Sequence, residues 1–140
     1  MYIGIDFDGT CVTHDFPKVG KDIGAVPILK KLVDKGHQLI LFTMRSDKKE
    51  VLTDHYDIHS KAEPYLTEAI NWFKQNDIEL FGIQTNPTQH TWTESPKAYC
   101  HLYIDDASLG CPLVIDKTLS DRPFVNWNHV DILLTDMGVI

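Results

Sequence analysis

The sequence predicts an α/β domain of three layers, with helices on both faces of a mostly parallel, five-stranded sheet. Short apolar runs alternate along the chain with stretches in which apolar residues recur at helical spacing. The first run, Tyr2 to Phe7, has no polar alternation, which is typical of a central parallel strand that is covered on both faces. A length of 140 residues suits a single domain over residues 1–140, with little room for a second.

Helices and further strands follow from the periodicity of the rest of the chain. Apolar residues recur at helical spacing between Ile28 and Val33, and Gly36 follows as a natural stop. Ser60 and Glu63 have the spacing of a capping box, so another helix begins there or a few residues later. The expected helices are 23–35, one from Ser60 onward, and 128–137, with a helical turn at 97–100 after a loop over 88–96. The expected strands after the first are 37–43, 78–83, 101–104 and 112–115, the last at an edge.

Composition and charge narrow the classes of protein that fit. The formal charge of −7 argues against a general nucleic-acid-binding surface, and no apolar run approaches the roughly 18 residues of a membrane span. Three cysteines without metal-site spacing indicate reduced thiols. The N-terminus enters a strand directly, unlike a signal or transit peptide. We therefore expect a cytoplasmic protein with no membrane partner.

Two carboxylates, Asp6 and Asp8, end the first strand, and Gly9 follows them. At the carboxyl end of an inner strand they would lie in the crevice where open α/β sheets bind ligands. Repulsion between the carboxylates requires a compensating charge, which a hard divalent cation supplies. Gly9 permits a tight turn at this point, because glycine adopts positive φ without steric cost.

The run Asp6-Phe7-Asp8-Gly9-Thr10 resembles the first motif of the haloacid dehalogenase-like (HAD) hydrolases, which are mostly Mg²⁺-dependent phosphatases and phosphotransferases. The resemblance implies a Thr or Ser at the end of the second strand, a later Lys or Arg, and an acidic pair after another apolar strand. Thr43, Lys97 and the pair Asp105-Asp106 meet these requirements in order. The resemblance therefore implies a small hydrolase with a Rossmann-like fold.

The chemistry of the candidate substrate-binding residues agrees with phosphoryl transfer. The hydroxyl of Thr43 and the backbone N–H of Met44 can donate to a phosphoryl oxygen. The ammonium of Lys97 can neutralise charge on a carboxylate and a phosphoryl group together. Arg45 can pair with a substrate phosphate, although a surface position is equally consistent with the sequence.

The resemblance also implies which residues bind Mg²⁺ and which react. Asp6 and Asp106 would be carboxylate ligands, with Asp105 in support and the backbone carbonyl of Asp8 completing the set. Asp6 would attack phosphorus and form an aspartyl-phosphate, while Asp8 would protonate the leaving oxygen and then activate water. The sequence leaves open whether Asp105 or Asp106 contacts the metal directly, although Asp106 is favoured.

Little room remains for the cap domain with which larger HAD-like enzymes select small metabolites, because core elements fill most of the chain between the motifs. An open site suits an exposed phosphate on a bulky or macromolecular substrate. Alternatively, a neighbouring subunit of a homo-oligomer, or the loops 11–21, 44–58 and 84–96, would cover the site. The physiological substrate therefore stays open.

Two other functions remain as alternatives. The first is a polynucleotide or nucleotide phosphatase, which rests on the missing cap and the Asp105-Asp106 pair. The second is a non-enzymatic, receiver-like phosphoacceptor, although such a module needs no acid at position 8. Two weaker features have simpler explanations. We interpret His55 and His59 as solvated residues and not as a second metal site, and Cys11 as a small filler residue.

Overall fold

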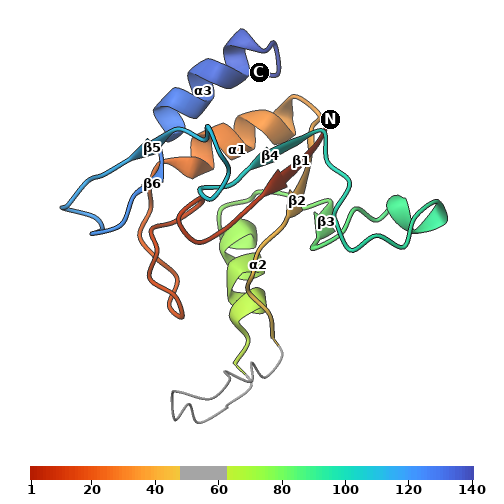
Figure 1. The fold of residues 1–140 in the computed structure, drawn as a ribbon, viewed down its shortest axis with the longest axis horizontal. Coiled ribbons are helices and arrows are strands. Elements are labelled where there is room, and N and C mark those ends of the chain that lie inside the picture. Colours follow the sequence, from red (N-terminus) through yellow and green to blue (C-terminus); the bar gives the residue numbers. More distant parts are fainter. Residues whose placement is uncertain (48–62) are drawn as a thin grey trace.

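The computed structural model describes residues 1–47 and 63–140 (Figure 1). Its elements in chain order are β1 (Tyr2–Ile5), α1 (Ala25–Asp34), β2 (Gln38–Leu41), α2 (Tyr65–Gln75), β3 (Gly82–Ile83), the 3₁₀ turn η1 (Gln89–Thr91), β4 (Leu102–Ile104), β5 (Leu113–Val114), β6 (Phe124–Val125) and α3 (Trp127–Asp136). The predicted alternation of strands and helices is confirmed from β1 to β3, and β4 follows without an α-helix before it. Most elements are shorter than the apolar runs that predicted them.

The main sheet has four parallel strands in the order β3-β2-β1-β4. The predicted central position of β1 is confirmed, because β1 pairs with β2 on one side and with β4 on the other. The chain moves from β1 to β2 to β3 in one direction and then returns to the far side of β1. Right-handed crossovers therefore place α1 and α2 on one face and the connection from β3 to β4 on the opposite face.

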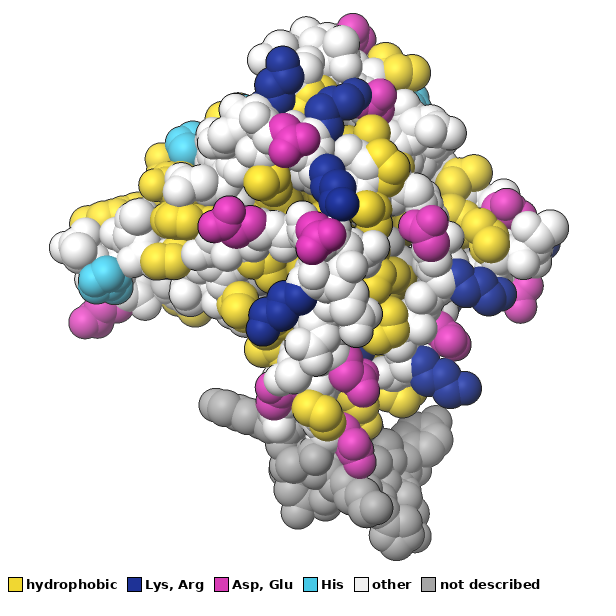
Figure 2. Space-filling model, turned by 180° about the vertical axis from the view of Figure 1, so that it is seen from behind, with side chains coloured by type: hydrophobic (Ala, Val, Ile, Leu, Met, Phe, Trp, Pro, Cys, Tyr) yellow, Lys and Arg dark blue, Asp and Glu magenta, His cyan; other side chains and the backbone are white. Residues whose placement is uncertain are grey.

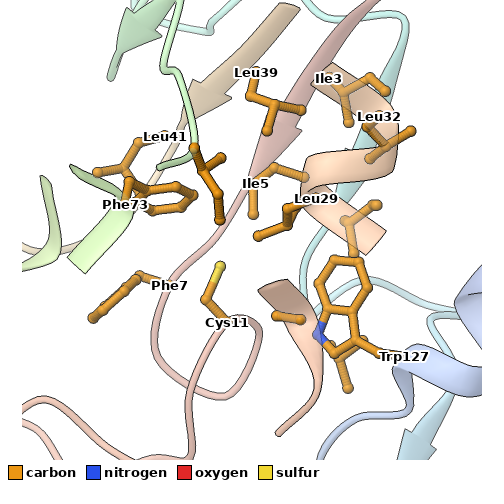
Figure 3. Packing of buried hydrophobic residues seen from close by; sticks show 14 of the residues in the cluster. Ile3, Ile5, Phe7, Cys11, Leu29, Leu32, Leu39, Leu41, Phe73 and Trp127 are labelled. Atoms are coloured by element: carbon orange, nitrogen blue, oxygen red, sulfur yellow. The ribbon is translucent and has the colours of Figure 1, made fainter. Parts of the chain in front are cut away.

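One face of the sheet carries the hydrophobic core (Figure 3). Side chains that are paired in register share a face, so residues 3, 39 and 102 lie together, as do residues 5, 41 and 104. The core cluster joins these strands to all three α-helices: Ile3, Ile5, Leu29, Leu32, Leu39, Leu41, Phe73, Ile104, Trp127, Val130 and Leu134. The helices α1, α2 and α3 therefore cover the same face.

The opposite face of the sheet is covered by the connection 84–101, which contains η1 but no α-helix. On this face Ile40 is buried, and a side chain at Gly82 would come within 2.9 Å of the Pro87 ring. Gly4 leaves space for the ring of Tyr103, since a Cβ there would be 2.7 Å from the ring Cδ1. The third layer of the predicted α/β/α arrangement is thus non-helical in the described residues.

The prediction of a fifth strand in the main sheet is wrong. Residues of β5 pair in antiparallel with β6, a strand that the sequence did not reveal. This hairpin extends away from the main sheet in Figure 1. It is held to the turn after β1, because the N–H of Val125 donates to the carbonyl of Gly9 (2.9 Å). Burial of Phe124 and Val125 is the physical reason for this pairing.

Two local expectations also differ from the structure. No helical turn forms at 97–100, whereas η1 lies in the predicted loop. The cause is the buried side chain of Gln89, whose amide donates to the carbonyls of Ser95 and Lys97 and accepts from the N–H of Tyr99. The helix α2 begins at Tyr65 with Pro64 at its N-cap, and Ser60 lies outside the described residues.

Among the residues that the structure describes, no helix has the length and apolar character needed to cross a membrane. Figure 2 shows one face of the molecule, on which Lys and Arg side chains are interspersed with Asp and Glu. This face has no continuous basic surface of the kind that binds nucleic acid through its phosphates.

The link between α3 and the turn after β1 provides a test of the fold. The buried Trp127 donates from Nε1 to the carbonyl of Thr10 (2.7 Å). The substitution Trp127→Phe leaves that buried carbonyl unpaired and should lower the free energy of unfolding by about 2–3 kcal/mol, measured by urea unfolding. The matched change Trp72→Phe replaces a half-buried indole by a smaller ring and should cost about 1 kcal/mol. Equal losses would contradict a specific role for the hydrogen bond.

Candidate active site

The ends of three strands lie level at one edge of the sheet. Ile5 is paired with Leu41 on one side and with Ile104 on the other. Because the strands are parallel, the residues that follow them leave the sheet at the same edge. Asp6 follows β1, Thr43 lies two residues after β2, and Asp105 follows β4. Sheet register therefore gathers these predicted site residues at one edge.

Three carboxylates meet at this edge. Asp6, Asp105 and Asp106 each offer an oxygen that lies within 4.8 Å of the others. The buried hydroxyl of Thr10 joins two of them, since it donates to Asp6 Oδ2 (3.1 Å) and accepts from the N–H of Asp106 (3.1 Å). The motif residue Thr10 thus fixes the first strand end relative to the fourth. We refer to the three carboxylates as the acidic cluster.

The electrostatics of the acidic cluster fit a bound cation. Burial raises the pKa of Asp6 from an ordinary value of 3.8 to about 7. The charges of Asp105 and Asp106 add to the rise, whereas hydrogen bonds from the Phe7 backbone and the Thr10 hydroxyl oppose it. Ionised carboxylates at this spacing repel one another unless a positive charge lies among them. Oxygen donors of this kind are the ligands that Mg²⁺ and other hard cations prefer.

Asp8 is not part of the acidic cluster. Its carboxylate forms a bidentate ion pair with Arg45, whose Nε donates to Oδ2 (2.6 Å) and whose Nη2 donates to Oδ1 (2.7 Å). The guanidinium is almost fully buried, and its remaining N–H groups donate to the carbonyls of Pro17, Lys18 and Tyr65. All five donors of Arg45 therefore have partners within the protein.

Arg45 also fixes a hairpin beside the site. Residues 13–21, which we call the flap, begin and end in the hydrogen bond from the N–H of Thr13 to the carbonyl of Lys21 (3.0 Å). The guanidinium carbon lies 5.0 Å from the ring centroid of Phe7 and 5.2 Å from that of Phe16 in the flap. Cation–π contacts on both sides add to the hydrogen bonds.

The surface alternative for Arg45 is therefore wrong, because its side chain is only 2% exposed. The proposed contact with a substrate phosphate is also unavailable in this geometry. A substrate would first have to displace Asp8 or one of the flap carbonyls. Sequence alone could not show this arrangement, since the partners of Arg45 come from three distant segments.

Thr43 lies at the site edge in a tight turn. Its N–H donates to Gln84 Oε1 (3.0 Å), and the Gln84 amide donates back to the Thr43 carbonyl (2.6 Å). The Thr43 hydroxyl accepts from the N–H of Arg45 (3.2 Å), which leaves its own hydrogen available as a donor. The side chain of Met44 is 93% exposed, so any contact with substrate would come from its backbone.

Lys97 is not brought to the acidic cluster. Its ammonium lies 5.7 Å from the ring centroid of Tyr103 and lines a cavity of about 260 Å³ with Trp92 and Tyr99, on the helix-free face of the sheet. Within the described residues Lys97 makes no ion pair. The absence of the expected helical turn at 97–100 accounts for this position.

His14 is a site residue that the sequence analysis did not single out. It lies in the flap, and its Nε2 is 2.7 Å from Asp106 Oδ2. A histidine in a polar, irregular segment has no periodic signal, so only the folded hairpin reveals its position. The residues His55 and His59 lie outside the described part of the chain.

Cys11 is fully buried beside Asp6 and donates from Sγ to the Asp6 carbonyl (3.2 Å). Burial raises the pKa of its thiol well above the ordinary value, and the charges of Asp6 and Asp8 act in the same direction. A buried thiol of this kind is unreactive. The interpretation of Cys11 as a filler residue is therefore supported.

Comparison with known proteins adds a structural relative. A solved structure of a conserved protein from Bacteroides thetaiotaomicron superimposes with a TM-score of 0.70 at 28% sequence identity, covering 98% of this chain and 91% of that chain. No protein-family model matches the chain, and no curated protein matches it either. The similarity shows that the α/β architecture described above is shared over nearly the whole chain.

The raised pKa of Asp6 predicts how the stability of the metal-free protein depends on pH. The contribution of protonated Asp6 to the free energy of unfolding is complete below about pH 4, and it is lost as the pH rises to about 7. Asp6→Asn lacks this loss and should exceed the parent in unfolding free energy by up to about 4 kcal/mol near pH 8, with little difference near pH 4. Urea unfolding with a chelator over this pH range measures the difference.

Two controls accompany this measurement. The exposed Asp121→Asn should follow the parent at every pH. Added Mg²⁺ should stabilise the parent near pH 8 and have a much smaller effect on Asp6→Asn. A constant difference between Asp6→Asn and the parent over the whole range would contradict the proposed ionisation.

The Asp8–Arg45 pair predicts a large effect on stability. Arg45→Met leaves Asp8 and three carbonyls without donors and should lower the unfolding free energy by about 3–5 kcal/mol. Arg45→Lys keeps the charge but not the planar fork and should show an intermediate loss. The exposed Arg122→Met should remain within about 0.5 kcal/mol of the parent. Equal stabilities for the Arg45 and Arg122 variants would exclude this role.

Proposed function

We propose that the protein is an Mg²⁺-dependent phosphomonoester hydrolase that acts through an aspartyl-phosphate on Asp6. The observation that carries the proposal is the acidic cluster, in which carboxylates from two strand ends meet beside a threonine hydroxyl. The order of the motif residues along the chain supports the same chemistry, since it is similar to that of the HAD-like hydrolases. The buried position of Asp6 beside two other acids further favours a site built around a cation.

The acidic cluster would hold the metal. Carboxylate oxygens would come from Asp6, Asp105 and Asp106. Since Arg45 engages the side chain of Asp8, the group that Asp8 can offer to the metal is its backbone carbonyl. Bound there, Mg²⁺ would neutralise charge on the transferring phosphoryl group. The choice between Asp105 and Asp106 as the direct ligand stays open, and contacts from His14 and Thr10 make Asp106 the more firmly held.

The reaction has two steps. In the first, the Asp6 carboxylate attacks phosphorus while the bond to the leaving oxygen breaks, and Asp8 gives that oxygen a proton. In the second, a water oxygen attacks phosphorus and the bond to Asp6 breaks, while Asp8 takes a proton from the water. Both carboxyl groups thereby return to their starting states. The Thr43 hydroxyl and the Met44 N–H donate to phosphoryl oxygens.

The ion pair with Arg45 sets a condition on the role of Asp8. The guanidinium donates to both oxygens of Asp8 and so occupies the atoms through which Asp8 would give or take a proton. Asp8 acts as an acid only when Arg45 releases one oxygen, and Arg45 is bound to the flap carbonyls of Pro17 and Lys18. Movement of the flap when substrate binds would release that oxygen, so that the flap takes the place of a cap.

Space for a leaving group lies next to the flap. A cavity of about 350 Å³ is bounded by Thr13, His14 and Lys21 of the flap and by Ser120 and Arg122 of the β5–β6 loop. Among the described residues no Phe, Tyr or Trp lines it, so a nucleobase could stack only on the ring of His14 or the guanidinium of Arg122. A small, polar phosphomonoester fits this cavity better than a nucleotide.

The Asp8–Arg45 pair also favours a second candidate, a phosphoacceptor module. If Arg45 keeps both oxygens of Asp8 engaged, Asp8 neither protonates a basic leaving group nor takes a proton from water, and a phosphorylated Asp6 persists. A small phosphodonor with a good leaving group would then label Asp6 without turnover. This candidate uses the same acidic cluster and differs only in the second step.

Release of phosphate from an aryl phosphate tests the proposal. The parent should require Mg²⁺, and Asp6→Asn should show only the background rate, because no nucleophile remains. Asp34→Asn, which changes an exposed acid at the end of α1, at the opposite edge of the sheet, should keep the parent rate. Mg²⁺-dependent turnover that survives in Asp6→Asn would overturn the assignment of the nucleophile.

Two further variants sharpen this experiment. Asp8→Asn should stall after the first step and remain phosphorylated on Asp6. If the parent itself becomes labelled on Asp6 without turnover, the phosphoacceptor module is favoured. Lys97→Met should keep the parent rate if Lys97 stays beside Tyr103, and should lose most of it if Lys97 moves to the phosphoryl group. Mass spectrometry of the trapped protein distinguishes the phosphorylated from the free state.

A further inference from the structure

We propose that His14 is a positioning residue that fixes the carboxylate of Asp106 and thereby sets the affinity of the site for Mg²⁺. The inference rests on the proposed metal site but assigns a role to a residue outside the motifs. It concerns the flap, which thus contributes to the acidic cluster from a segment that is distant in sequence from β4.

The hydrogen bond has a defined direction. An ionised carboxylate can only accept, so the 2.7 Å contact requires a hydrogen on His14 Nε2. Both the neutral Nε2–H tautomer and the imidazolium supply that hydrogen. The positioning therefore does not depend on a second proton. With Oδ2 occupied in this way, Oδ1, which has only a long contact with the Thr10 hydroxyl (3.5 Å), is the oxygen of Asp106 that a cation would take.

Gly9 makes room for this contact. A Cβ at position 9 would overlap with Nε2 of His14 and would lie 2.7 Å from Asp106 Oδ2. Gly9 also has φ +81°, a value that other residues rarely adopt. Gly9 therefore forms the turn after β1 and also leaves the space in which His14 of the flap reaches Asp106 after β4.

The backbone that carries His14 is fixed on both sides. Val12 bridges Asp22, and the Thr13 side chain accepts from the N–H of Lys21 (2.9 Å). Thr13 is 2% exposed, and the carbonyl of Thr13 lies against Gly20, where no Cβ would fit. A rigid hairpin base of this kind leaves His14 few alternative positions, so its ring can orient Asp106 before a metal binds.

Preorganisation of a metal ligand has a measurable consequence. Without His14, Asp106 keeps its backbone bond to Thr10 and a long contact between Oδ1 and the Thr10 hydroxyl (3.5 Å), but loses the short hydrogen bond that orients its side chain. Groups that orient metal ligands typically change metal affinity by about 10–100-fold. We therefore expect His14→Ala to weaken Mg²⁺ binding to that extent while the fold is kept.

Isothermal titration of the metal-free protein with MgCl₂ measures this effect without reference to turnover. His14→Gln places an amide N–H close to the position of Nε2 and should recover most of the affinity. His14→Asn carries the same amide on a shorter side chain, cannot reach Asp106, and should resemble His14→Ala. The exposed His129→Ala should bind Mg²⁺ like the parent. Circular dichroism checks that each variant is folded.

The outcomes separate this inference from the proposed function. A parent that binds Mg²⁺ and hydrolyses the aryl phosphate, with equal affinities in His14→Gln and His14→Asn, would overturn the role of His14 and leave the hydrolase proposal intact. A parent that binds no Mg²⁺ would overturn both. Recovery by Gln but not by Asn would support positioning through the hydrogen bond, since a purely structural loss would not distinguish the two amides.

Discussion

The register of β1 with its two neighbours is the constraint on which the site depends. Because Ile5 is level with both Leu41 and Ile104, three chain segments leave the sheet together. A shift of one residue against β4 would move Asp6 away from Asp105, and a shift against β2 would move it away from Thr43; either would turn buried side chains to the other face. The buried Thr10, which bonds to Asp6 and Asp106, then fixes the distance between the strand ends. Core packing and site geometry are therefore consequences of the same pairing.

Charges at this edge are arranged in two separate groups. Arg45 neutralises Asp8 within the protein, whereas the acidic cluster has no comparable cation among the described residues. In this structure the protein thus satisfies one carboxylate internally and leaves three whose repulsion a ligand can relieve. The flap contacts both groups, because its backbone binds Arg45 while its His14 binds Asp106. A motion confined to the flap tip at Pro17 and Lys18 would affect the acid at position 8, while the fixed base of the flap keeps His14 on the metal ligand at position 106.

The sequence predicted those features that rest on local pattern. The strand before Asp6, the helix that ends before Gly36, and the acidic pair after β4 all carry apolar runs or turn residues that can be read directly. Features that depend on tertiary pairing were missed or misplaced. The strand β6 has two residues and no periodicity, and Arg45 and His14 meet partners that are far along the chain. Gln89 bonds to the backbone of Lys97 and Tyr99 and so holds residues 97–100 out of helical geometry.

The departure of β5 from the main sheet has a consequence for solubility during folding. It leaves β4 as an outer strand, with β3 at the other side. An outer strand offers unpaired backbone groups on which another chain can add, which is a common route to aggregation. Here the two outer strands have only three and two residues, too few to template a stable intermolecular ladder. Because these outer strands are short, they need no fifth strand to cover their edges.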